Sequence, residues 1–337
     1  MTTMRAILAG LTLALALPLS GAFANDSEAE WAIGGLVLKA NDDISMDRED
    51  LFLSADEVRV DYVYTNHADT DSEVTIAFPL PALPQANGYA DPYAYPDWDA
   101  FEFATTVDGE PVAWEMVDRA MIGDRDVTDL VLAEGLPVHW YRDEAMYERM
   151  EALPDAQRMR WLELGLLEDL PDAGMAMPAW QGQRHLVRVQ TFPAGQHVRV
   201  SHRYTPFAGG SVGGLLETQA REEDWAQEYL AEYRTRYCME DSFLAAIDRK
   251  LAPRDGTPPP MTSETWLGYV LSSGANWRGP IGEFRLVVDK GDADNLVSFC
   301  MDGVRKISPT QFEVVKRDFE PTEDLDILIV NFHDAED

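Results

Sequence analysis

The stretch "VRVDYVYTN", Val58–Asn66, decides the fold class of this chain. Valine and tyrosine occupy every second position and polar residues fill most positions between them, which is the pattern of a strand with one buried face. Val74–Leu80 repeats this spacing after a polar turn. We therefore expect the two stretches to pair as antiparallel strands.

Two further hairpins are predicted beyond this pair. Phe101–Val107 and Val112–Val117 flank Asp108-Gly109, which supplies the positive φ angles of a tight turn. Leu186–Phe192 and His197–Tyr204 flank a Pro-Ala-Gly turn in the same way. Each pair is expected to form neighbouring antiparallel strands.

The C-terminal part of the chain also has strand patterns. The expected strands are Leu267–Leu271, Glu283–Asp289, Asn295–Met301, Gln311–Arg317 and Leu325–Phe332. The last of these, "LDILIVNF", is nearly all apolar, as expected for a strand that is covered on both faces.

Two segments have helical periodicity instead. The first contains a helix over Asp143–Leu153 and a second helix over residues 154–166. The second covers about residues 222–251. Four of its aromatic residues lie four apart: Trp225, Tyr229, Tyr233 and Tyr237. The chain is thus predicted to be mainly β, an α+β protein with antiparallel β-sandwich architecture and helical insertions.

The first 24 residues have the features of a cleavable secretory signal. Arg5 precedes an apolar run, Ala6–Leu17, that is too short to span a bilayer, and Ala22-Phe23-Ala24 fits the small-residue cleavage pattern. We expect cleavage after Ala24. The mature protein is then expected to be soluble, in the periplasm or outside the cell, with no transmembrane anchor.

The mature chain is expected to form one unit over residues 25–333. Its expected parts are β-sandwich strands in 25–125 and 183–215, a helical insertion in 126–182, a helical segment in 220–252 and a C-terminal β part in 264–333.

The acidic composition argues against nucleic acid and anionic membranes as partners. The chain has 60 acidic and 27 basic residues, for a formal net charge of −33. Removing the signal deletes Arg5 and no acid, which changes the charge to −34. Such a chain repels phosphate groups. A solvated acidic surface is favoured over cation binding, because charge runs are usually solvated faces.

Cys238 and Cys300 are the two cysteines of the chain. An isolated pair in an oxidising compartment is typical of a disulfide. Closing a loop of about 60 residues stabilises a fold by roughly 4 kcal/mol in the chain-entropy model. The competing interpretation, a reactive thiol, needs a nearby base that the sequence does not show.

Two glycine-rich stretches imitate functional motifs. "SGANWRGPIGEF", Ser273–Phe284, would cradle a phosphate only if a helix followed it, but a strand is expected there. A hairpin-like turn is favoured, with Trp277 folded back on the core. "GGSVG", Gly209–Gly213, matches the serine hydrolase pattern with Ser211 as nucleophile. Helical sequence resumes only near Glu222, too late for a nucleophile elbow, so a flexible connection is favoured.

The histidines and acidic turns form no local metal motif. His197 and His202 are five apart on an expected strand and so point to opposite faces. His202 falls on the apolar face, as a hydrogen-bonded core residue. "DTDSE", Asp69–Glu73, and "DADN", Asp292–Asn295, resemble the start of calcium loops but lack the glycine and glutamate of an EF-hand. We assign no cofactor and no metal ligand.

The stretch "PQANGYADPYAYPDWD", from Pro84, is the best binding candidate. Its prolines exclude a central strand, so it is expected to be a long surface loop. Exposed rings interleaved with acids could stack on sugars or receive a partner segment. The candidate contact residues are Tyr89, Tyr93, Tyr95 and Trp98. A loop that packs these rings against its own sandwich is the favoured alternative.

Several long segments, taken in order, resemble a family of bacterial exported proteins. They are residues 25–66, "VTIAFPLP" at 74–81, "QTFPAGQHVRVSHRYTPFAGGSVGG" at 190–214, and residues 272–314, which open with "SSGANWRGPIGEF". They are similar to the family designated DUF4424, a domain of unknown function, from about Asn25 to Phe332. The resemblance implies an exported protein and a single family-wide unit. It implies no established activity and transfers no catalytic or binding residue.

We therefore expect an exported, non-catalytic binding or envelope-associated protein whose partner is an envelope protein or glycan. The alternative is an enzyme that hydrolyses an envelope glycan or ester with carboxylates brought together by the fold. Two carboxylates in an apolar cleft would favour the enzyme. Rings exposed on a surface loop would favour the binding protein.

Overall fold

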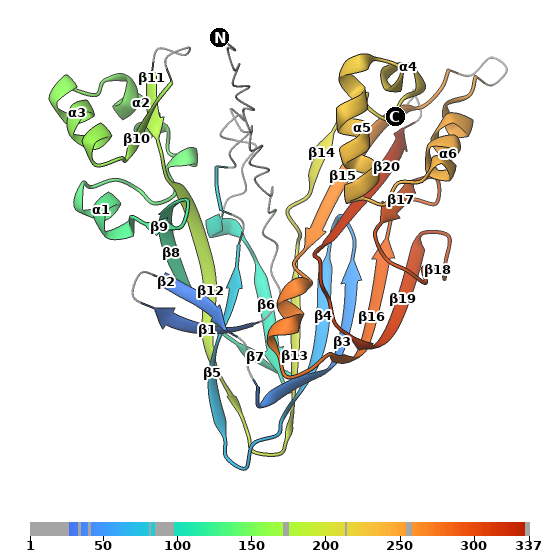
Figure 1. The fold of residues 1–337 in the computed structure, drawn as a ribbon, viewed down its shortest axis with the longest axis horizontal. Helices are drawn as coiled ribbons and strands as arrows, with labels where there is room; N and C mark the ends of the chain where they lie inside the picture. The colour runs from blue at the N-terminus through green and yellow to red at the C-terminus, as the bar shows by residue number, and fades with distance from the viewer. Residues whose placement is uncertain are drawn as a thin grey trace, which may run out of the picture.

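Strands dominate the computed structural model, which describes residues 27–32, 35–39, 42–80, 82–84, 98–170, 175–212, 214–253 and 258–333. They form several mainly antiparallel sheets, and most helices lie in two groups (Figure 1). This confirms the prediction of a mainly β protein with a few helices. The expected signal sequence lies outside the described residues.

The largest sheet has eight strands. In spatial order they are β18 (Arg305–Lys306), β19 (Gln311–Phe319), β16 (Ile281–Asp289), β3 (Ile44–Leu53), β4 (Val58–Asn66), β13 (His197–Tyr204), β6 (Phe103–Val107) and β7 (Glu110–Val112). Neighbouring strands are antiparallel except β16 and β3, which are parallel. Alternate residues of β3, β4, β13 and β16 line the main hydrophobic core.

A six-stranded sheet contributes to the same core. Its order is β2 (Gly35–Lys39), β1 (Ser27–Ala32), β5 (Ser72–Pro79), β12 (Gln181–Phe192), β8 (Glu115–Ile122) and β9 (Arg125–Asp126). Val74, Ile76 and Phe192 of this sheet are buried among the inward residues of the eight-stranded sheet. The two sheets therefore form a sandwich.

A four-stranded sheet completes the main core. Its order is β14 (Gly209–Ser211), β15 (Met261–Tyr269), β20 (Leu325–His333) and β17 (Leu296–Phe299). Leu267, Ile327 and Phe299 of this sheet belong to the main core. The eight-stranded sheet thus packs against two smaller sheets.

Three predicted hairpins are wrong. β4 pairs with β3 and β13, whereas β5 pairs with β1 and β12, so these consecutive strands lie in different sheets. The same holds for β12 and β13, and the segment after β15 crosses to β16 in the eight-stranded sheet (Figure 1). Strands that face each other across a sandwich bury alternate residues just as paired strands do, so the alternation does not reveal the partner.

One local prediction is confirmed in part and another in full. The predicted tight turn is present, with φ angles of 50° and 88° at Asp108 and Gly109, and β6 pairs with β7 across it. The predicted second strand covers Val112–Val117, but β7 ends at Val112, and residues from Glu115 onward belong to β8 in the six-stranded sheet. The strand β20 lies between β15 and β17. Its Ile327 lies in the main core, while Leu328 packs into a separate core beneath helices. The "LDILIVNF" strand is therefore covered on both faces.

Most helices form two groups that extend the smaller sheets. The first group contains α1 (Thr128–Ala133), α2 (Glu144–Glu151) and α3 (Asp155–Glu163), near the hairpin of β10 (Leu167–Leu170) and β11 (Met175–Pro178). The second group contains α4 (Thr218–Arg221), α5 (Asp224–Arg236) and α6 (Asp241–Leu251). Figure 1 shows two arms that diverge from the sandwich. We call α1–α3 with β8–β12 the first arm, and α4–α6 with the four-stranded sheet the second arm.

The second helical segment is interrupted where the disulfide forms. α5 ends at Arg236 and α6 begins at Asp241, with Cys238 at a φ of 48° between them. The Sγ atoms of Cys238 and Cys300 are 2.12 Å apart. Cys300 directly follows β17, so the predicted bond joins the second helical segment to the C-terminal strands.

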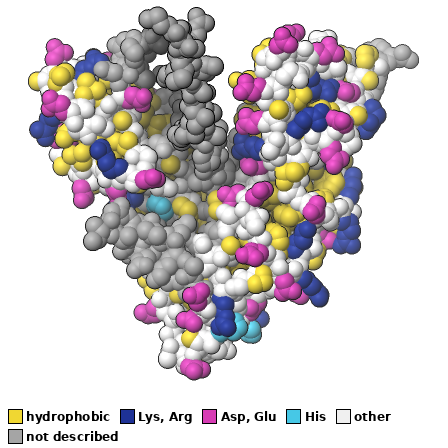
Figure 2. Space-filling view, in the orientation of Figure 1, with side chains coloured by type: hydrophobic (Ala, Val, Ile, Leu, Met, Phe, Trp, Pro, Cys, Tyr) yellow, Lys and Arg dark blue, Asp and Glu magenta, His cyan; other side chains and the backbone are white. Residues whose placement is uncertain are grey.

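The described surface agrees with the acidic composition. Acidic side chains are spread over the face shown in Figure 2, with basic ones among them. Among the helices of the described ranges, none has the length and apolarity needed to cross a bilayer.

Candidate functional site

The structure describes the residues at both ends of the predicted aromatic loop, Pro84 and Trp98. Three of its rings lie outside the described residues: Tyr89, Tyr93 and Tyr95. Trp98 begins the short 3₁₀ helix η2 (Trp98–Ala100) and is 4% exposed. Its ring packs edge-on against Phe207, with the centroids 4.4 Å apart, and against Phe101 at 6.1 Å. Trp98 therefore anchors this end of the loop in the core of the first arm.

Both ends of the loop, residues 85–97, are held by the same strand. Before the loop, Leu83 exchanges two backbone hydrogen bonds with Gly182 of β12, at 2.9 and 2.6 Å. After the loop, Asp99 forms an ion pair of 2.7 Å with Arg184 of β12. A short run of β12 thus holds the described residues on both sides of residues 85–97.

Arg184 lies at the centre of an ionic network. Its Nε and Nη2 donate to the two carboxylate oxygens of Asp118 at 2.7 and 2.8 Å, and its Nη1 donates to Asp99 at 2.7 Å. His139 Nε2 is 3.0 Å from Asp118 Oδ1. Asp118 comes from β8, and His139 precedes the 3₁₀ helix η3 (Trp140–Arg142). We call Asp99, Asp118, His139 and Arg184 the loop-base network.

The loop-base network stabilises the charged forms of Asp118 and Arg184. Burial disfavours ionised Asp118, but hydrogen bonds and charge from Arg184 and His139 outweigh this and lower its pKa far below the usual range. The hydrogen bond to Asp118 raises the pKa of Arg184 despite the burial of its guanidinium. Both groups therefore stay ionised near neutral pH. This suits a bidentate anchor rather than a proton donor.

The close packing around His139 requires glycine at position 182. A Cβ built on Gly182 would lie 2.5 Å from His139 Nδ1 and 2.9 Å from the carbonyl oxygen of Val138. Any larger residue would displace the imidazole that contacts Asp118. Gly182 thus has two roles: its backbone bonds to Leu83, and its missing side chain leaves space for His139.

His185 follows Arg184 on β12 and is 8% exposed. Burial, together with the nearby charge of Arg119, lowers the pKa of His185 to about 4. The ring is consequently neutral at pH 7, and a buried positive charge is avoided beside Arg184.

A second polar cluster is enclosed in the main core. Glu49 of β3 is fully buried and accepts a hydrogen bond of 3.3 Å from the Tyr269 hydroxyl, which lies 2.8 Å from the Tyr62 hydroxyl. The ring of His202 packs near Tyr62, and its Nδ1 is 2.8 Å from Thr105 Oγ1. His202 is 1% exposed, so it is the hydrogen-bonded core residue that the sequence predicted.

Glu49 faces inward because of a β-bulge. The register between β3 and β4 shifts between Met46 and Arg48. One extra residue reverses the alternation, so Met46 and Glu49 both point into the core although they are three apart. Since Glu49, Tyr62, Tyr269 and His202 are each at most 1% exposed, the cluster is enclosed in the protein and closed to substrate.

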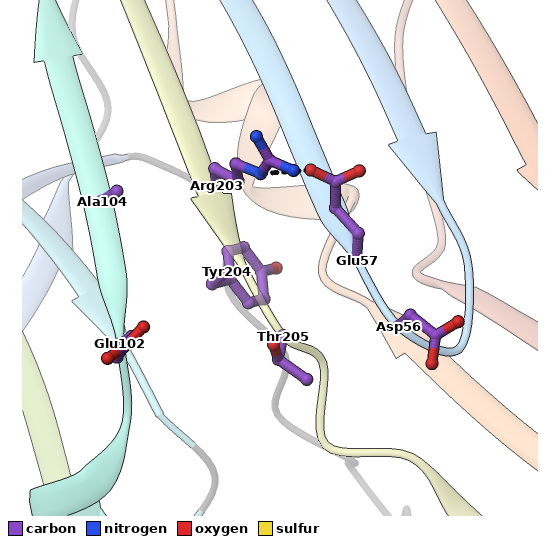
Figure 3. A pocket seen from close by; sticks show the side chains of 7 residues that line it. All are labelled: Asp56, Glu57, Glu102, Ala104, Arg203, Tyr204 and Thr205. Atoms are coloured by element: carbon purple, nitrogen blue, oxygen red, sulfur yellow. Dashed lines mark ion pairs between the residues drawn. The ribbon is translucent and has the colours of Figure 1, made fainter.

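A small cavity lies beside β4, β13 and β6 (Figure 3). Its volume is about 240 Å³, and its lining residues are Asp56, Glu57, Glu102, Ala104, Arg203, Tyr204 and Thr205. Arg203 and Glu57 point toward each other and form an ion pair. Pockets for small ligands commonly measure roughly 300–1,000 Å³. This cavity is smaller, and its central charges already satisfy each other.

The motifs singled out in the sequence have structural roles. Ser211 ends β14, an edge strand paired with β15, and no helix follows it directly. Trp277 is 3% exposed and packs on Tyr64 with the ring centroids 4.8 Å apart, as predicted. In the "DADN" turn Asp292 accepts a backbone hydrogen bond of 2.7 Å from Asp294, which is typical of an Asx turn. Within the described ranges, no three histidine, cysteine or acidic side chains gather as metal ligands.

Sequence reasoning missed the loop-base network. Arg184 and Asp118 are 66 residues apart, and Arg184 and Asp99 are 85 apart, so no local spacing links them. One signal was available. The alternation of β12 places Arg184 on the same face as Leu186 and Phe192, and an arginine on an apolar face needs a buried partner.

Comparison with known families gives one match. Residues 24–328 match the model of DUF4424, described as a domain of unknown function. No curated protein matches the chain.

Two solved structures show only distant likeness. One, from Legionella pneumophila subsp. pneumophila str. Philadelphia 1, is described as a "putative nutrient binding protein"; it is 14% identical, with a TM-score of 0.38 over 86% of this chain and 68% of that one. An M1 zinc metallopeptidase from Deinococcus radiodurans is 8% identical, with a TM-score of 0.27 over 87% of this chain and 43% of its own. The chain thus spans less than half of the metallopeptidase. At these TM-scores neither likeness indicates a function.

Proposed function

The chain belongs to the DUF4424 family, and from this premise we propose that it is an exported, non-catalytic binding protein of the cell envelope. Its contact surface is the aromatic loop, where Tyr89, Tyr93 and Tyr95 bind an envelope protein or glycan. Two features support export: the signal pattern of residues 1–24, and a disulfide, which suits an oxidising compartment.

The observation that carries this proposal is the double attachment of the loop to β12. Leu83 is bonded to Gly182 and Asp99 to Arg184, so both ends of the loop are fixed to a buried strand. Binding residues often lie on loops that a rigid scaffold positions. Fixed ends also reduce the conformational entropy that the loop loses when it binds. Trp98 contributes by anchoring, which leaves the three tyrosines as the proposed contact residues.

The ionisation of Asp118 and Glu264 favours binding over hydrolysis. A glycosidase needs a carboxylic acid with a raised pKa close to an ionised carboxylate. Asp118 has a lowered pKa and is held by Arg184. Burial raises the pKa of Glu264, but its Oε2 accepts hydrogen bonds from Trp266 and Tyr233, at 2.9 and 3.0 Å, in the other arm. Asp118 and Glu264 therefore lie in different arms and do not form the pair of carboxyl groups that a glycosidase needs.

Recovery of partners from envelope extract tests the proposal. The mature protein is compared with a Tyr93→Ala/Tyr95→Ala variant, and we expect recovery to fall at least about tenfold because the stacking rings are lost. Trp98 is left intact because its loss would unpack the first arm.

Tyr93→Phe/Tyr95→Phe is the matched control, since it keeps both rings. We expect it to retain most of the recovery of the unmodified protein. If the alanine variant recovers the same partners as fully as the other two proteins, the aromatic loop is not the contact surface.

A further inference from the structure

Helix α5 in the second arm exposes a pair of aromatic rings. Trp225 and Tyr229 are 58% and 55% exposed, and their ring centroids are 6.5 Å apart. They are four residues apart, so they lie on one face of the helix. Ala226 and Leu230 of the same helix are buried. The helix is therefore packed through one face, and it presents both rings on another.

Exposed acidic side chains surround the two rings. Five exposed carboxylates precede or flank them: Glu222, Glu223, Asp224, Glu228 and Glu232. Glu228 is three residues from Trp225, and Glu232 is three from Tyr229, so each ring has an acid on its own side of the helix. Within the described residues, none of the five carboxylates has a basic side chain at ion-pair distance.

The arginines in α5 and directly before it form ion pairs with other acids. They form the ion pairs Arg221–Asp248, Arg234–Asp241 and Arg236–Asp326. Figure 2 shows acidic, apolar and basic side chains interspersed on the arm that carries this helix. The outward face of α5 thus combines two accessible π faces with five exposed carboxylates, none of which is in an ion pair within the described residues. Of the five, Glu232 also interacts electrostatically with Arg236.

We propose that this face of α5 binds a basic segment of a partner protein. Arginine or lysine side chains would stack on Trp225 and Tyr229, because aromatic faces attract cations. The surrounding carboxylates would attract the same side chains and steer their approach. A second copy of this chain would bring like charge and is disfavoured. The face lies in the second arm and the aromatic loop joins the first, so this inference does not rest on the loop proposal.

The probe is a fluorescein-labelled peptide that alternates arginine with leucine, and its binding is followed by fluorescence anisotropy. Measurement at about 0.15 M salt, where the Debye length is about 8 Å, suppresses long-range attraction to the acidic surface as a whole. Trp225→Ala/Tyr229→Ala keeps every charge and should weaken binding about tenfold or more. Glu228→Gln/Glu232→Gln should weaken binding about three- to tenfold.

Glu320→Gln/Glu323→Gln is the matched control, because it removes the same charge from two exposed positions outside α5. We expect it to bind the peptide as the unmodified protein does. If Glu320→Gln/Glu323→Gln weakened peptide binding as much as Glu228→Gln/Glu232→Gln does, binding would depend on total charge and not on the face of α5, and the proposal would be wrong. Unchanged binding by the Trp225→Ala/Tyr229→Ala variant would also overturn the proposal.

Two further measurements separate this proposal from other effects. Circular dichroism should show an unchanged fold for the Trp225→Ala/Tyr229→Ala variant, since both side chains are exposed. The Tyr93→Ala/Tyr95→Ala variant should bind the peptide with unchanged affinity. Loss of binding in that variant would place the peptide on the loop and contradict a site on α5.

Discussion

The three side-chain nitrogens of Arg184 join Asp99, next to the aromatic loop, to Asp118 of β8. Asp118→Asn would leave the buried guanidinium with a weaker, neutral acceptor. Breaking a buried ion pair from one side costs about 3–5 kcal/mol, and we expect a loss of about 2–3 kcal/mol because solvent reaches part of Asp118. Urea denaturation gives the change in the free energy of unfolding.

Asp326→Asn is the matched control for Asp118→Asn. It removes the acceptor of Arg236, in a pair whose side chains are 36% and 32% exposed. We expect it to cost less than about 1 kcal/mol, because solvent screens such a pair. Equal losses in the two variants would mean that the loop-base network is an ordinary surface pair.

His185 should make stability depend on pH. Its pKa falls from 6.5 to about 4 on folding. Between these values the unfolded chain binds a proton that the folded chain does not, so this contribution is complete above pH 6.5 and is lost as the pH falls toward 4. The loss should be on the order of 3 kcal/mol.

His185→Gln removes the titrating group and isolates this contribution. The free energy of unfolding, measured for both proteins from pH 4 to pH 7, should fall more steeply for the unmodified protein as the medium is acidified. The pKa of Asp118 is also lowered, so this carboxyl begins to reduce stability below about pH 5, but both proteins contain Asp118 and its effect cancels in the difference between their curves. Parallel curves would show that His185 does not carry the effect.

At the scale of elements, the bulge in β3 depends on its neighbour β16. A Cβ on Gly282 would lie 2.7 Å from the carbonyl oxygen of Asp47 in the bulge. Gly282→Ala should therefore destabilise the protein by about 1–3 kcal/mol, since the backbone must move. Val315→Ala, at an exposed position of β19, should cost less than about 0.5 kcal/mol. Thermal unfolding compares them, and similar melting temperatures would contradict this role for the glycine.

The disulfide should stabilise the second arm in particular. Its cysteines are 62 residues apart. Cys238→Ser/Cys300→Ser should lower the free energy of unfolding by about 2–4 kcal/mol. Amide hydrogen exchange should become faster in α5 and α6 and stay unchanged in α2 and α3. Equal acceleration in both arms would show that the bond stabilises the whole molecule instead.

Elements were easier to predict than their partners. The alternation in Val58–Asn66 and Val74–Leu80 correctly indicated strands, but it could not show that they face each other across the sandwich. The four-residue spacing from Trp225 to Tyr237 indicated a helix. A step of four residues turns about 40° beyond one helical turn, so the row of rings drifts around the axis. Trp225 is therefore exposed while Tyr237 is buried.

Over the whole molecule, long strands join the two arms to one sandwich. β12 places Phe192 in the main core and Leu186 in the core of the first arm. β20 likewise places Ile327 in the main core and Leu328 in the core of the second arm. Each arm is therefore a continuation of a buried sheet. The base of the aromatic loop and the outer face of α5 are therefore both attached to the same β-sandwich.

The candidate site could be predicted from the sequence only in part. The composition near Tyr93 predicts a surface loop, because rings, prolines and acids alternate there, and this prediction lies outside the described residues. It could not show that Trp98 is buried, since exposed and buried tryptophans look alike in a sequence. The partners Asp118 and Arg184 meet only because β8 pairs with β12, and that pairing comes from the sheet topology. Long-range pairing, not local pattern, creates the base of the loop.

Photocrosslinking in the envelope tests binding through the aromatic loop most directly. A photoreactive phenylalanine analogue replaces Tyr93 in one protein and Val315, which is 57% exposed on β19, in another. Irradiation should attach an envelope component at position 93 and leave position 315 without an adduct. Adducts of equal yield at both positions, or an adduct at 315 alone, would contradict a contact surface on this loop.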